Sequence, residues 1–156
     1  MLTSKTVAGF LLTTVFMFSN VMPHATASAG IDPVNKGEDG EAIHGYDAVA
    51  YFTEGKPVRG DEAYAHEWMG ATWYFSSDAN KVLFIKEPNK YTPQYGGYCA
   101  YAVGNNYTAN GDPIAWSIVD NKLYLNYNKK VREMWSKDKS DLIRKGDANW
   151  PGLLKR

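Results

Sequence analysis

The sequence predicts a small α+β domain, in which one antiparallel sheet carries a central helix and the C-terminal helices pack on it. Three observations predict this class. Short β-prone runs occur in pairs joined by turns, a capped apolar run lies between them, and helical stretches close the chain. The chain has 156 residues, which is enough for one domain with its own core. Aromatic residues make up 14% of it, so large rings can fill that core.

The first part of the domain combines strands with one helix. Residues 47–52 are β-prone and end at a turn that contains Gly and Pro. Residues 63–76 alternate in polarity around Met69-Gly70, which indicates two short strands joined by a turn. Ser77 is a favourable N-cap, and Pro88 stops the run that follows, so we expect a helix between them.

The second part begins with a connector over 87–98 that contains two prolines and a Gly-Gly pair. Such a segment must turn sharply or approach another backbone closely. Residues 99–103 are then expected to run as a strand or a buried extended segment. Two further β-prone runs flank Asp120-Asn121, which is a two-residue hairpin signal.

Helices are expected to end the domain. Asn126 or Asn128 is expected to cap the first of one or two short helices between residues 129 and 150. Pro151 is expected to end the ordered part. No internal repeat is visible in the sequence.

The N-terminus is typical of a secretory signal peptide. Lys5 precedes a charge-free, mostly apolar run over residues 7–18, and small residues follow at Ala27 and Ala29. The run is too short for the ~20 residues of a membrane-spanning helix, which argues against an uncleaved anchor. We expect cleavage after Ala29, or alternatively after Ala27, and a periplasmic or secreted product without a membrane span.

The expected organisation is therefore a signal peptide over 1–29, a flexible leader over 30–45 and a domain over 46–154. The leader is rich in Gly and charge and poor in large apolar residues. Basic and acidic residues number 17 each, and no basic block interrupts the chain. Binding of nucleic acid through a positive face is therefore not expected.

Several long motifs resemble the exported YHS-domain family of bacterial proteins. They are GYDAVAYFTEGKPV, GATWYFSS, the Pro-x-x-Tyr of residues 88–91, PQYGGYCAYAV, DPIAW and KLYLNYNKKV. The resemblance extends over about residues 43–154 and implies a compact α+β domain in the periplasm. Shorter YHS domains look like metal-binding modules, often attached to heavy-metal transporters, with cysteines as ligands.

This chain departs from that short form at the cysteine positions. Ala50 follows Asp47-Ala48-Val49 where the short form has a cysteine. Ser76 and Asn80 stand where the short form has two cysteines around the start of the helix. A metal site therefore cannot be carried over from the resemblance and must be built from other residues.

Cys99 is the only cysteine of the chain, so it cannot form a disulfide within it. It is a buried small residue, a reactive thiol, a metal ligand or half of an intermolecular bridge. The Gly-Gly-Tyr turn before it predicts a pocket near the thiol. The expected lining is Tyr95, Tyr98 and Tyr101, with the polar pair Tyr46 and Asp47 as a second candidate site.

Three functions remain open from the sequence. The first is a periplasmic binding or accessory module that holds copper or another heavy metal through Cys99 with His66 or His44. The second is a thiol-dependent redox protein or enzyme that uses Cys99. The third is a non-catalytic module that docks on an envelope protein. The spacing selects no nucleophile and base, so we expect a protein that is not an enzyme.

Overall fold

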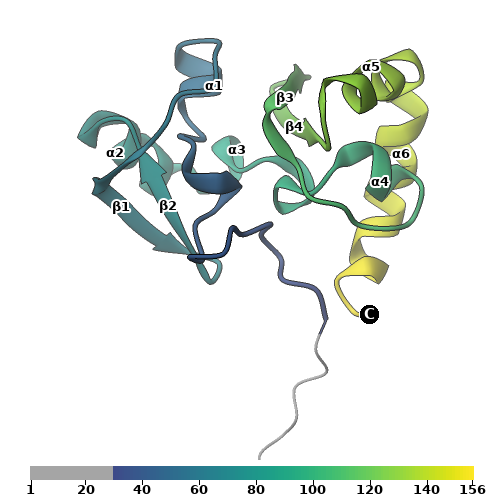
Figure 1. Cartoon of the computed structure of the whole chain (residues 1–156), viewed down its shortest axis with the longest axis horizontal. Coiled ribbons are helices and arrows are strands. Elements are labelled where there is room, and N and C mark those ends of the chain that lie inside the picture. Colours follow the sequence, from purple (N-terminus) through teal and green to yellow (C-terminus); the bar gives the residue numbers. More distant parts are fainter. Residues whose placement is uncertain (1–29) are drawn as a thin grey trace, which may run out of the picture.

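The computed structural model describes residues 30–156, and the expected signal peptide lies outside them. Helices and two-stranded antiparallel sheets alternate along the chain, which confirms the α+β class. The strands do not form one sheet, however. Figure 1 shows two hairpins in separate halves of the molecule, with the short helix α3 (Pro88–Tyr91) between them.

The first unit, residues 43–91, is built around the hairpin at Met69-Gly70. Its elements are η1 (Ile43–Gly45), α1 (Ala50–Thr53), β1 (Asp61–Trp68), β2 (Ala71–Phe75), α2 (Asp78–Lys86) and α3. Met69 and Gly70 both have positive φ, as the tight turn between β1 and β2 requires. Ser77 accepts a hydrogen bond from the Asn80 backbone and begins α2, which confirms the predicted cap.

The second unit, residues 94–153, repeats this order around the hairpin at Asp120-Asn121. Its elements are η2 (Gln94–Gly97), α4 (Ala100–Gly104), β3 (Asp112–Val119), β4 (Lys122–Asn126), α5 (Lys129–Lys137) and α6 (Lys139–Leu153). Asn128 accepts a hydrogen bond from the Val131 backbone and caps α5, so the choice between Asn126 and Asn128 is decided. The ordered part of the chain does not end at Pro151, because this proline lies inside the last turns of α6.

Two predicted strands are short helices instead. Residues 47–52 lead into α1 because the Asp47 side chain accepts hydrogen bonds from the Val49 and Ala50 backbones, at 2.8 and 3.2 Å. Residues 99–103 lead into α4, whose Tyr101 backbone donates to the Asn126 side chain. A local side chain, Asp47, overrides the β propensity of the first run, and a distant one, Asn126, overrides that of the second.

The two units match in detail, although the sequence shows no repeat. Both hairpins begin at an aspartate, Asp61 or Asp112, and both have an irregular register after it. Each aspartate accepts a hydrogen bond from the backbone two residues later, at 2.8 and 2.9 Å. Each hairpin leads through a capped turn into a nine-residue helix, α2 or α5. The chain thus contains the same structural unit twice.

The cores of the two units rest on equivalent ring pairs. Trp73 of β2 packs on Phe84 of α2 with ring centroids 4.9 Å apart and a 31° tilt. Tyr124 of β4 packs on Trp135 of α5 at 5.3 Å and 37°. All four rings are buried. Side chains of different identity therefore perform the same packing role, which explains why the repeat is not visible in the residue letters.

Residues 30–45 are packed against both units, which corrects the expected flexible leader. Val34 and Ile43 are buried in the core of the first unit. Asn35 reaches the second unit, because its backbone N–H donates to the Gly96 carbonyl at 2.8 Å and its side chain accepts from Gly111. Gly96 has a φ of 60°, and a side chain there would overlap the Pro33 carbonyl. The segment ties the units together. Within residues 30–156, no helix is long and apolar enough to cross a membrane.

Candidate functional site

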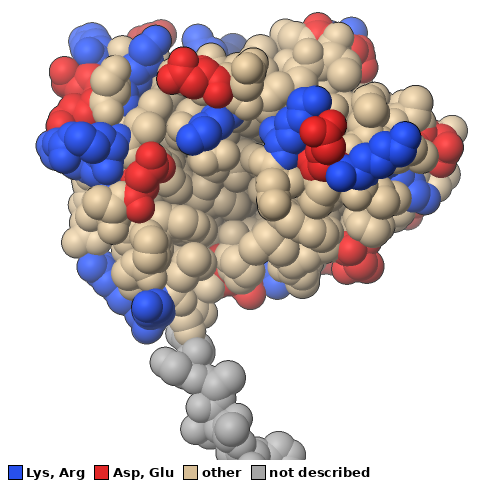
Figure 2. Space-filling view, turned by 180° about the vertical axis from the view of Figure 1, so that it is seen from behind, with Lys and Arg blue, Asp and Glu red and all other residues tan. Residues whose placement is uncertain are grey.

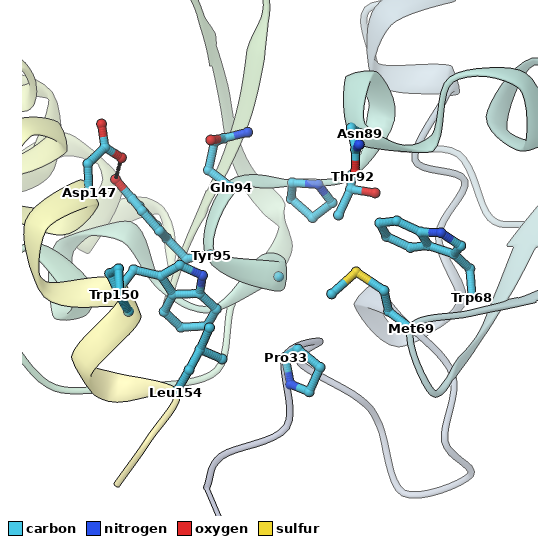
Figure 3. Close-up of a pocket in the computed structure, with 13 residues that line it drawn as sticks. Pro33, Trp68, Met69, Asn89, Thr92, Gln94, Tyr95, Asp147, Trp150 and Leu154 are labelled. Carbon is cyan, nitrogen blue, oxygen red and sulfur yellow. Dashed lines mark hydrogen bonds between the residues drawn. The ribbon is translucent and has the colours of Figure 1, made fainter.

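A cleft of about 310 Å³ lies where the two units meet. Figure 3 shows Trp68 and Met69, at the turn of the first hairpin, on one side of it, and Trp150 of α6 and Leu154, just after α6, on the other. Tyr95 lies between them. The remaining lining residues are Pro33, Asn89, Thr92, Pro93, Gln94, Gly96, Asp147 and Pro151. The lining is mostly apolar with a few polar groups, which is typical of a small-molecule site.

The floor of the cleft is held by the strained segment before Cys99. Tyr95 has a φ of 57°, a backbone conformation that residues other than glycine rarely adopt. Its hydroxyl donates to Asp147 Oδ1 at 2.9 Å, and its ring lies 5.9 Å from that of Trp150. The η2 turn therefore fixes the ring against α6, and α6 in turn presents Asp147 at the rim.

The cleft has a negative character. Asp147 is the one ionisable carboxylate of its lining, and the lining contains no Lys, Arg or His. Burial and the hydrogen bond to Asp147 raise the pKa of Tyr95 well above its usual range. Burial and the same carboxylate raise the pKa of Tyr124 to about 12. Elsewhere acidic and basic side chains alternate, and Figure 2 shows both signs interspersed over one face.

Cys99 lies on a second cavity, of about 210 Å³, in the second unit. The thiol is buried, with 1% of the residue exposed, and donates to Asn126 Oδ1 at 3.8 Å. Other lining residues are Tyr101, Ala102, Tyr107, Ala109, Tyr127 and Val131. The amide nitrogen of Asn126 is buried and has no hydrogen-bond partner among the described residues. The lining of this cavity thus combines one sulfur with three tyrosine side chains.

The position of Cys99 in the second unit corresponds to that of Asp47 in the first. The Asp47 backbone donates to the Val58 carbonyl and the Cys99 backbone to the Ala109 carbonyl, both at 2.8 Å. Each follows a Gly-Tyr pair and precedes a short helix. The two residues differ in what faces them, since Asp47 meets polar groups and Cys99 meets a cavity.

The buried Asp47 carboxylate is fully occupied by hydrogen bonds. Its Oδ2 accepts from the Ser76 backbone at 2.8 Å, the Ser76 hydroxyl at 2.7 Å and the Asn80 amide at 2.7 Å. Its Oδ1 accepts hydrogen bonds from the backbone N–H groups of Val49 and Ala50, where α1 begins. Ser76 and Asn80 therefore donate their hydrogen bonds to the buried carboxylate, and this cluster stabilises the fold.

The two candidate histidines lie in the first unit, and neither lines the Cys99 cavity. His66 is on β1 opposite Trp73, with its ring 6.4 Å from that of Phe84. His44 lies in η1 at a φ of 53°, and its carbonyl accepts a hydrogen bond from Arg59. Over residues 30–156, no group of three His, Cys, Asp or Glu side chains could hold a metal ion. The donors that the geometry gathers therefore do not fit a ready-made metal site.

The predicted tyrosines divide among different places. Tyr101 lines the Cys99 cavity, whereas Tyr95 lines the cleft between the units. Tyr98 packs on Trp150 with centroids 5.8 Å apart. Tyr46 lies under the Arg59 guanidinium, which is 4.7 Å from the ring centroid. Of these tyrosines, the one that lies with Cys99 is Tyr101.

Sequence reasoning did not find Trp68, Met69, Asp147 or Trp150 as site residues. The first two and the last two come from distant parts of the chain, and they line one cleft only because the first hairpin and α6 face each other across η2. The Gly-Gly pair and the prolines beside it did signal a close backbone approach. That signal pointed to the correct segment but not to the residues opposite it.

The family model of the YHS domain matches residues 49–95. The resemblance seen in the sequence is confirmed over this range, which covers most of the first unit and ends at Tyr95. No curated protein and no solved structure matches the chain. The matched range contains Trp68, Met69 and Tyr95 of the cleft, whereas Cys99, Asp147 and Trp150 lie beyond it.

Proposed function

We propose that this chain, whose residues 49–95 match the YHS domain, is a small non-catalytic binding module that acts outside the cytoplasm after removal of its signal peptide. Its ligand is a small organic molecule that enters the cleft between the units. The observation that carries the proposal is the cleft itself, which joins rings of both units around a few polar groups.

The side chains of the cleft favour binding over catalysis. The hydroxyl of Thr92 already donates to the Pro88 carbonyl at 2.7 Å, and the Tyr95 hydroxyl donates to Asp147. The lining contains no Cys, Ser, His or Lys that could act as an activated nucleophile. The remaining groups can orient a ligand through hydrogen bonds and contact it through rings.

A compound screen with two matched variants tests this proposal. Met69 and Ile85 are exposed to 47% and 46%, and only Met69 lines the cleft. A long charged side chain at either place should leave the fold intact, because both positions face solvent. We expect Met69→Arg to abolish binding of small organic compounds measured by tryptophan fluorescence, and Ile85→Arg to preserve it. Equal loss, or no loss, in the two variants would contradict the proposal.

A second candidate function is the binding of copper or another heavy metal through Cys99 with His66 or His44. The sulfur of Cys99 on the wall of a cavity favours it, because a soft thiolate is a ligand that such metals prefer. Because neither histidine lines that cavity, binding requires the second donor to move. Titration with Cu(I) and Zn(II), alongside Cys99→Ser, measures this directly. Tight one-to-one binding that the substitution abolishes would support a thiolate site, and unchanged binding would exclude one.

The other two functions find less support in the geometry. A reactive thiolate needs exposure and a nearby cation, but Cys99 is buried and its cavity is lined by no Lys, Arg or His. A protein-docking surface needs a contiguous apolar patch. The exposed large apolar residues are spread over both units, with Val82 and Ile85 together on α2 and Tyr107 and Tyr127 together at the Cys99 cavity: Met69, Val82, Ile85, Tyr107, Ile114, Tyr127 and Met134.

A further inference from the structure

We infer that the cleft between the units selects small organic cations, such as quaternary ammonium compounds, over neutral molecules of the same shape. This inference rests on the proposed function and names the ligand class of the same cleft. Three features carry it: an unpaired carboxylate, the absence of competing positive charge in the lining, and ring faces that a cation prefers to a neutral group.

The carboxylate is Asp147. Its Oδ1 accepts a hydrogen bond from the Tyr95 hydroxyl, and the carboxylate forms no salt bridge with any residue of the described chain. It differs in this from Asp141 on the same helix, which pairs with Arg144 and Lys145 at 2.5 and 2.6 Å. Asp147 therefore lines the cleft as an acidic side chain without an ion-pair partner among residues 30–156.

The rings come from both sides of the cleft. Trp68 packs its ring against Trp73 and Phe84, with centroids 5.9 and 5.6 Å away, so the first unit fixes it. Trp150 is fixed in the same way by Tyr95 and Tyr98. Figure 3 shows Trp68 and Trp150 on opposite sides of the opening. Indole faces attract cations within about 6 Å of the ring centroid, and rings fixed in advance lose little freedom on binding.

The lining also disfavours other ligand classes. An anion would meet Asp147 and find no Lys or Arg among the lining residues. A strongly hydrated metal ion would find a single carboxylate, and the other side-chain oxygens of the lining, such as those on Asn89, Thr92 and Gln94, are neutral. An organic ammonium group is weakly hydrated and carries its charge on an apolar surface. It can therefore contact the ring faces while its charge is attracted toward the side of the cleft that carries Asp147.

A pair of isosteric compounds tests the inference on the unaltered protein. Choline and 3,3-dimethyl-1-butanol have the same shape, but only choline carries a charge. We expect choline to change the tryptophan fluorescence in a saturable way and to bind at least tenfold more tightly than the alcohol. Raising the salt concentration should weaken choline binding, because an exposed charge pair is screened.

Two variants on α6 assign the effect to Asp147. Asp147→Asn should weaken choline binding at least fivefold, whereas Asp141→Asn removes one charge from the same helix outside the cleft lining and should leave binding unchanged. Circular dichroism of both variants checks the fold, and the isostere comparison stands if Asp147→Asn does not fold.

The outcomes separate the inference from the proposed function. Equal binding of choline and the alcohol would overturn the cation preference and leave the cleft as a site for neutral molecules. The same conclusion would follow if screened neutral compounds bind and choline does not. If no compound binds in a way that Met69→Arg abolishes, both the inference and the proposed function fail.

Discussion

At the scale of single residues, one equivalent backbone position carries different side chains in the two units. In the first unit it carries Asp47, whose carboxylate accepts five hydrogen bonds in a fully buried place. In the second unit it carries Cys99, which faces a cavity. The same turn thus supports a polar anchor in one unit and an open space in the other.

Removal of the Asp47 carboxylate should destabilise the protein strongly. Asp47→Ala leaves the donors of Ser76 and Asn80 buried without an acceptor, so we expect a loss of about 3 kcal/mol in the free energy of unfolding. Asp61→Ala is the matched control, because the exposed Asp61 accepts a single backbone bond and should cost under about 1 kcal/mol. Denaturant unfolding measures both. Equal losses would contradict the structural role of Asp47.

Cys99 should behave as a buried thiol. With 1% of the residue exposed, it should resist a thiol reagent such as Ellman's reagent in the folded protein and react once denaturant unfolds the chain. Cys99→Ala should cost about 1 kcal/mol, since it removes a small buried group beside an existing cavity. Rapid labelling of the native protein would instead place the thiol at the surface.

At the scale of elements, the two units use the same capping rule with different residues. Ser77 caps α2 and Asn128 caps α5, each by accepting a bond from the backbone three residues later, at 3.2 and 2.9 Å. We expect Ser77→Ala and Asn128→Ala each to lower the free energy of unfolding by about 1 kcal/mol. Ser136, an exposed serine within α5, is the control and should be nearly neutral when changed to Ala. A large effect at one cap alone would argue against equivalent units.

Elements whose signals are local could be predicted from the sequence. The turns at Met69-Gly70 and Asp120-Asn121 and the cap at Ser77 depend on a few neighbouring residues, and all three were found. The helices α1 and α4 were missed, because bonds from the side chains of Asp47 and Asn126 set their conformation. The Asn126 bond comes from β4, which no local pattern near α4 reveals.

The candidate site could be predicted only in part, for the same reason. The thiol of Cys99 lies on a cavity that Tyr101 also lines, whereas the small residues around the thiol indicated tight packing. The histidines expected beside it lie in the first unit. The cleft was not foreseen at all, because its rings meet through the packing of whole units rather than through spacing along the chain.

At the scale of the whole molecule, buried tyrosines link stability to alkaline pH. Burial raises the pKa of Tyr51 and Tyr95 above their usual range and that of Tyr124 to about 12, against an ordinary value of 10.0. Because the folded state holds these protons more tightly than the unfolded chain, their contribution to stability is complete below pH 10. It is lost as the pH rises from 10 through 12.

Unfolding by urea at a series of pH values between 8 and 12 checks this dependence. The free energy of unfolding should fall steadily above pH 10, and Tyr124→Phe should make the fall shallower because one titrating hydroxyl is gone. Tyr107→Phe, at a half-exposed position, is the control and should change the slope less. Stability that is constant to pH 12 would contradict the buried placement of these hydroxyls.

The arrangement of the whole molecule also explains why the cleft exists. Residues 30–45 contact both units, η2 begins the second unit at the cleft, and the long α6 brings Trp150 opposite the first hairpin. A single unit would have only one side of the opening. Ligand binding in the cleft is therefore a property of the pair, and neither unit alone provides it.

The most direct test of this account is a ¹H–¹⁵N NMR titration of the protein with choline. The account predicts that the indole N–H signals of Trp68 and Trp150 and the amides of Gln94 and Gly96 shift together and saturate. The buried indole of Trp135 should not move. Shifts that gather around Ala102 and Tyr107 of the Cys99 cavity, or no saturable shift at the cleft residues, would contradict it.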